Sequence, residues 1–155
     1  MSERPLSPAA EQALACVLDA IVPARDDGRL PAAGALGLVA PVSERLGDAA
    51  PLVAQGLAAL EERAVARGAS GLAALEPGDR AELLEEFATQ QPAFLPLLSF
   101  HTYTAYYQHP RVLEALGLEA RPPYPGGYEL EPGDLSLLDR VRERPRLYRE
   151  TGEAS

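Results

Sequence analysis

The stretch PAFLPLLSFHTYTAYYQH, residues 92–109, decides the fold class and contains most of the aromatic side chains of the chain. Drawn as a helix, it is apolar or aromatic around almost its whole circumference, and it has no Asp, Glu, Lys or Arg. A helix without a polar face lies at the centre of a core or packs against a partner. The sequence therefore predicts a helical protein in which this helix has two apolar sides to cover.

The rest of the composition also favours helices. Hydrophobic residues make up 46% of the 155 residues, and most of them are Ala and Leu rather than Ile and Val. Ala and Leu lose little conformational entropy in a helix, whereas β-branched residues prefer strands. We predict an all-α bundle of about five to seven helices in a single domain over 1–155. Its core covers about 7–141, a Pro/Gly/Tyr-rich loop lies near its C-terminus, and a mixed-charge tail covers 142–155.

Proline and capping signals place the other helices on either side of the aromatic stretch. Ser7-Pro8 is a helix start, because Ser caps and Pro is tolerated in the first turn, and Pro23 ends that helix. Residues 24–34 read as a loop. We expect further helices in five regions. They lie within 36–46, between Asp48 and Gly68, from Pro77 onward, between Pro110 and Gly117, and between Asp134 and Pro145.

Net charge and composition exclude several function classes. The formal net charge is −9 and all 14 basic residues are Arg. Such an acidic chain is repelled by phosphate backbones, so we expect no nucleic-acid partner. Without Lys, Schiff-base chemistry and a phosphate-binding lysine are impossible. The single cysteine, Cys16, falls inside the first helix, where a buried, inert thiol is expected.

Features of membrane insertion or export are also missing from the sequence as written. No apolar run approaches the roughly 20 residues that span a bilayer. The residues before Ser7 contain no basic-then-apolar signal peptide. We therefore expect a cytoplasmic protein without a membrane span.

The candidate functional residues concentrate in residues 91–128. This segment holds two Arg and two Glu, yet it contains five of the six Tyr, two of the three Phe and both His. Phe94, Leu97, Leu98, His101 and Ala105 share one side of the helix and suit a buried seam. Another side carries aromatic residues that can form a partner surface or a pocket, since Tyr is favoured at interfaces. The candidate partner- or ligand-binding residues are Phe100, His101, Tyr103, Tyr106, Tyr107, Tyr124, Gly126, Gly127 and Tyr128.

Motifs of catalysis and cofactor binding are missing. The sequence has no G-x-G-x-x-G, P-loop, G-x-S-x-G, H-E-x-x-H or C-x-x-C pattern. We therefore assign no catalytic, cofactor-binding or metal-binding residue and expect a non-catalytic chain. Two rival hypotheses stay open. The first is a small-molecule pocket made by His101, Tyr103, Tyr107, Tyr124 and Tyr128. The second is a metal-dependent enzyme that uses His101 or His109 with Glu85 or Glu86.

The order of these features resembles the gluconate 2-dehydrogenase subunit 3 family. The opening helix ends in Ile21-Val22-Pro23, and the loop Asp26-Asp27-Gly28 follows it. Leu75-Glu76-Pro77 starts a later helix. The most specific feature is the aromatic helix of residues 100–110, which is followed by the loop Tyr124-Pro125-Gly126-Gly127-Tyr128. The resemblance covers about residues 7–130.

The resemblance implies a small accessory subunit without a cofactor. Such a subunit associates with a large flavin-dependent dehydrogenase of the glucose-methanol-choline type and supports its maturation. Family members often carry a twin-arginine signal for export, which this sequence does not show. The aromatic segment would then be the partner surface or the core that shapes it, and self-association is also possible.

Overall fold

The structure is a computed structural model that describes residues 6–121, 124–127 and 131–145. Contacts between residues divide the chain into two compact units, Met1–Pro122 and Pro123–Ser155. Every regular element in the described ranges is a helix, which confirms the all-α prediction. The single domain predicted over 1–155 stays a prediction.

The helices of the first unit begin where the sequence signals place them. The Ser7 side chain accepts a hydrogen bond from the N–H of Ala10, and a Pro lies at the first or second position of four of the helices. The elements are α1 (Pro8–Ile21), η1 (Gly34–Leu36), α2 (Val39–Arg45), η2 (Gly47–Ala49), α3 (Ala50–Ala66), η3 (Leu72–Ala74), α4 (Pro77–Gln90), α5 (Phe94–Tyr106) and α6 (Pro110–Ala115).

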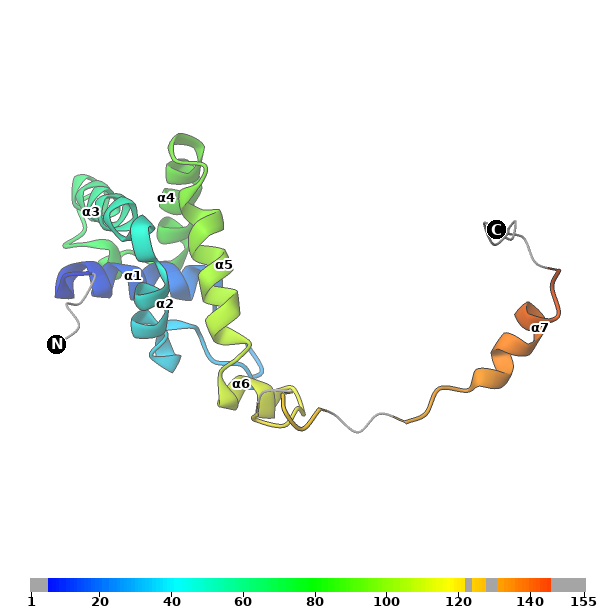
Figure 1. The fold of residues 1–155 in the computed structure, drawn as a ribbon. Helices are drawn as coiled ribbons and strands as arrows, with labels where there is room; N and C mark the ends of the chain where they lie inside the picture. The colour runs from blue at the N-terminus through cyan, green and yellow to red at the C-terminus, as the bar shows by residue number, and fades with distance from the viewer. Residues whose placement is uncertain (1–5, 122–123, 128–130, 146–155) are drawn as a thin grey trace. The chain divides into compact units, whose positions relative to one another are not determined.

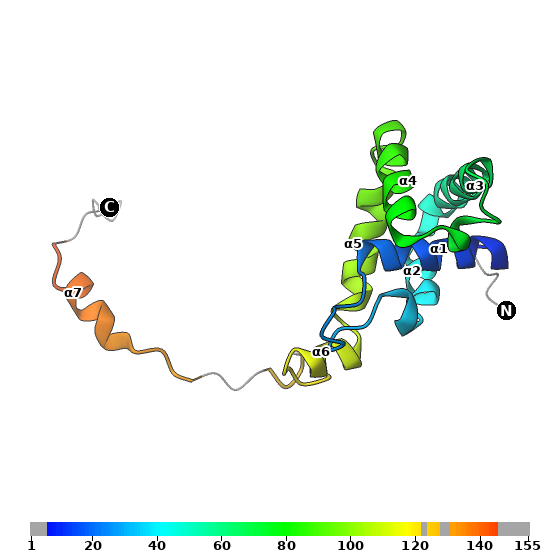
Figure 2. The same cartoon turned by 180° about the vertical axis from the view of Figure 1, so that it is seen from behind.

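Helix α1 is the centre of the first unit. It contacts α2, α3, α4 and α5. Figure 1 shows it crossing behind α2 and α5, and Figure 2 shows the same arrangement from behind. Leu14, Val17 and Leu18 follow an i, i+3, i+4 spacing along it and have no exposed surface, whereas Ile21, at i+7, is partly buried. This spacing places the three buried side chains on one side of the helix, which faces the core.

A pair of phenylalanine rings joins α3, α4 and α5. Phe87 of α4 and Phe94 of α5 pack edge to face, with ring centroids 5.1 Å apart. The guanidinium carbon of Arg63 in α3 lies 4.9 Å from the Phe87 centroid. Phe94 packs directly on the backbone of α3 at Gly56, where a Cβ would lie 2.7 Å from Cδ2 of the ring. Glycine at this position therefore lets the Phe94 ring approach α3 closely.

Three side chains hold the connections against the helices. The Tyr106 hydroxyl donates to the carbonyl oxygen of Pro31 at 2.9 Å, and the N–H of Gly34 donates to Asp19 Oδ1 at 2.6 Å. The Arg80 guanidinium donates to the carbonyl oxygens around η3. The predicted loop of residues 24–34 is thus a loop that is fixed at its end.

The second unit has only short helices in its described part. Asp134 accepts a hydrogen bond from the N–H of Ser136, as a predicted cap should, and η4 (Leu135–Leu138) and α7 (Asp139–Arg142) follow. Within this unit, residues 131–145 have no buried side chain. All buried residues in the described ranges lie between Leu6 and Val112, so the core they form is shorter than the predicted 7–141.

Candidate functional site

Helix α5 has a buried side that follows a spacing of four residues. Phe94, Leu98, Thr102 and Tyr106 are buried, together with Ala105. Thr102 is tolerated there because its hydroxyl donates to the carbonyl oxygen of Leu98 at 2.6 Å. The predicted seam was therefore partly wrong: Phe94, Leu98 and Ala105 are buried, but Leu97 and His101 are only partly buried.

The opposite side of α5 is exposed and aromatic. Phe100 is 68% exposed, Tyr103 46%, and Tyr107, the residue at the C-terminal cap of α5, 51%. Their i, i+3, i+7 spacing places them on one face. We call these three residues the aromatic face. In the described part of the first unit, seven large hydrophobic side chains are exposed, and five of them lie between residues 100 and 118. In the first unit, apolar exposure is therefore concentrated on α5 and on the segment that follows α6 rather than scattered.

Two rings of the aromatic face contact each other, and the third contacts a neighbouring histidine. The rings of Tyr103 and Tyr107 have centroids 6.3 Å apart, and the Phe100 ring packs edge to face with His101 at 5.3 Å. Among the described residues, neither the Tyr103 nor the Tyr107 hydroxyl has a hydrogen-bond partner. An apolar surface with free hydroxyl groups is typical of protein interfaces.

The other candidate residues do not all join this face. Tyr106 is 1% exposed and belongs to the core, where burial and then the neighbouring Tyr107 raise its pKa. It was predicted as a binding residue, and it is unavailable because its side chain packs inward. Tyr124, Gly126 and Gly127 are exposed in the second unit. Tyr128 lies outside the described residues.

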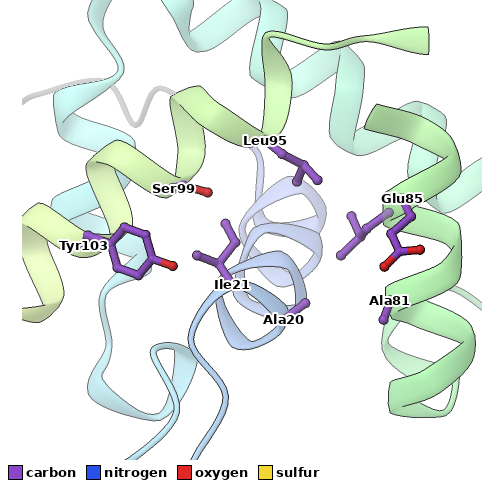
Figure 3. Close-up of a pocket in the computed structure, with 8 residues that line it drawn as sticks. Ala20, Ile21, Ala81, Glu85, Leu95, Ser99 and Tyr103 are labelled. Carbon is purple, nitrogen blue, oxygen red and sulfur yellow. The ribbon is translucent and has the colours of Figure 1, made fainter. Parts of the chain in front are cut away.

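A pocket lies beside the aromatic face, between α1, α4 and α5 (Figure 3). Its volume is about 240 Å³. Five residues were predicted to make a ligand pocket, and among the described residues that line this pocket only Tyr103 is one of them. The lining residues are Ala20, Ile21, Ala81, Leu84, Glu85, Leu95, Ser99 and Tyr103. The sequence did not reveal the pocket because three separate helices form it, and no local pattern encodes how helices cross.

The side chain of His109 has a structural role. His109 Nδ1 accepts a hydrogen bond from the N–H of Arg111 at 3.3 Å, so the side chain caps α6. Burial is the main cause that raises the pKa of the Cys16 thiol. Within the described ranges, no group of three or more His, Cys, Asp or Glu residues is placed to hold a metal ion. No helix in those ranges is both long and apolar enough to span a bilayer.

In the described residues, these observations define a helical first unit that has an exposed aromatic face on α5. A family model described as gluconate 2-dehydrogenase subunit 3 matches residues 8–126. The chain belongs to the gluconate 2-dehydrogenase subunit 3 family, which confirms the resemblance in the sequence. Comparisons with curated proteins and with solved structures find no match.

Proposed function

We propose that this chain is a non-catalytic accessory subunit that binds and stabilises a flavin-dependent dehydrogenase of the glucose-methanol-choline type. The observation that carries the proposal is the aromatic face of α5, Phe100, Tyr103 and Tyr107. The family description names a dehydrogenase subunit, and a subunit needs a surface for its partner.

The chemistry of α5 supports a protein partner. The helix has no Asp, Glu, Lys or Arg, and the cores of interfaces are poor in charge and rich in aromatic residues. Phe94 and Tyr106 anchor its buried side in the core, so the helix backbone that carries the exposed side chains is held in place before binding. A rigid surface loses little conformational entropy when a partner covers it.

A small-molecule pocket made by the predicted aromatic residues has less support. The aromatic face is an exposed surface, whereas ligand pockets are concave and bury most of the ligand. The pocket beside the face has a volume of about 240 Å³, below the roughly 300–1,000 Å³ of typical ligand pockets.

Co-purification tests the proposal. The chain with an affinity tag is expressed in its source organism, and the proteins recovered with it are identified by mass spectrometry and flavin absorbance. We expect a flavoprotein dehydrogenase in a fixed ratio to the chain. Recovery of a free monomer, or of proteins without flavin, would contradict the proposal.

A further inference from the structure

The pocket between α1, α4 and α5 has a mixed lining. Apolar side chains of all three helices form its walls, including Ile21, Leu84 and Leu95. The polar groups are the hydroxyls of Ser99 and Tyr103 and the carboxylate of Glu85. Figure 3 shows the Tyr103 ring on one side and Glu85 on the other, with Ile21 between them.

Glu85 is a free negative charge at this pocket. In the described part of the chain it has no ion pair or hydrogen bond, whereas its neighbour Glu86 pairs with Arg67 at 2.6 Å. Glu82, one turn earlier on α4, is also exposed and acidic. The described lining has no basic residue. An occupant with a positive charge next to an apolar group therefore complements the pocket better than a neutral or acidic one.

The size of the pocket indicates what kind of group can enter. A volume of about 240 Å³ is small for a cofactor or a drug-sized ligand, which need roughly 300–1,000 Å³. It suits one protruding side chain of a protein. Binding hot spots are often single side chains that fill pockets of this kind near the centre of an interface.

The pocket is also continuous with the aromatic face. Tyr103 belongs to both, because it lines the pocket and is 46% exposed on α5. A protein that covers Phe100, Tyr103 and Tyr107 therefore also lies over the entrance of the pocket, because Tyr103 is at its edge.

We infer that this pocket receives an apolar side chain of the dehydrogenase partner, next to an Arg or Lys that pairs with Glu85. The inference rests on the proposed function and adds the chemistry of the partner's contact. Glu85 would also discriminate between partners, because a protein that places an acidic residue opposite Glu85 is repelled.

Two substitutions test the contact. Glu85→Arg reverses the charge, and Ala81→Trp fills the pocket from an exposed position on α4. Glu62→Arg, at an exposed position of α3, makes the same charge change away from the pocket and is the control. Binding is measured by titration calorimetry with the flavoprotein that co-purifies with the chain. We expect each pocket variant to raise Kd at least about tenfold and the control less than about twofold.

The outcomes separate this inference from the proposed function. If a flavoprotein binds and both pocket variants bind it like the unchanged chain, the inference is wrong and the proposed function stands. If no flavoprotein binds the unchanged chain, both fail. A homodimer that Glu85→Arg dissociates in sedimentation would make a second copy the occupant. A small molecule in native mass spectra that Ala81→Trp removes would make it a ligand pocket. Either result overturns the inference.

Discussion

Replacing Gly56 by Ala should destabilise the protein, although this change normally stabilises a helix. In the interior of a helix, Ala is favoured over Gly by roughly 0.5–1 kcal/mol. At Gly56, however, the new Cβ would lie 2.7 Å from Cδ2 of Phe94, well inside the 3.4 Å at which ordinary contact begins. Phe94 is 1% exposed and packs on Phe87, so its ring cannot move freely.

The overpacking outweighs the gain in helix propensity. Extra methyl groups in a tight core cost about 1–3 kcal/mol, and a contact as short as this one belongs to the upper half of that range, so we expect a net loss of about 1–2 kcal/mol. This corresponds to a decrease in Tm of roughly 3–8 °C, measured by circular dichroism. Gly78→Ala in α4 is the control, because its Cβ meets nothing within 4 Å. Adding Phe94→Leu should make Gly56→Ala less harmful than it is alone. If Gly56→Ala is as stable as the Gly78→Ala control, the claim that Phe94 packs directly on α3 at Gly56 is wrong.

Three further predictions concern two hydrogen-bonding side chains and the thiol of Cys16. Tyr106→Phe removes the hydrogen bond to the Pro31 carbonyl oxygen and should lower the free energy of unfolding in urea by about 1 kcal/mol. Tyr107→Phe is the control and should cost nothing measurable, because the Tyr107 hydroxyl has no partner in the described residues. Arg80→Met leaves the carbonyl oxygens around η3 without their donor and should cost about 1–3 kcal/mol, more than Arg45→Met at an exposed helix end. Burial raises the pKa of the Cys16 thiol above that of an ordinary thiol, an effect that Arg80 opposes, so iodoacetamide at about pH 8 should modify the folded chain more slowly than the unfolded chain. Because the pKa of the folded thiol is raised, its contribution to stability is fully present below the pKa of the unfolded thiol and is lost as pH rises through the folded-state pKa. Equal alkylation rates of the folded and the unfolded chain would contradict the raised pKa.

The sequence predicted those parts of the fold that depend on local chemistry. Ser7-Pro8 and Pro23 bound the first helix, and Leu14, Val17 and Leu18 are its core side, because caps, prolines and helical spacing act within a few residues. The exposed side of α5 followed from the same spacing.

Other features depend on contacts that local patterns do not encode. Tyr106 looked like its exposed neighbour Tyr107, and only the distant Pro31 carbonyl distinguishes the two. Thr102 is buried because its hydroxyl is satisfied within its own helix. The pocket beside Tyr103 arises from the crossing of α1, α4 and α5, which no single segment specifies.

The most direct test of the central claim compares two sets of exposed apolar side chains. One variant replaces Phe100, Tyr103 and Tyr107 of the aromatic face by Ser. The other makes the same replacement at Leu52 and Val65, which are exposed on α3. Both are titrated against the co-purified flavoprotein after circular dichroism has shown that they are folded. If the aromatic face binds the dehydrogenase, the α5 variant loses at least about 100-fold in affinity and the α3 variant binds normally. Unchanged affinity of the α5 variant would contradict the claim.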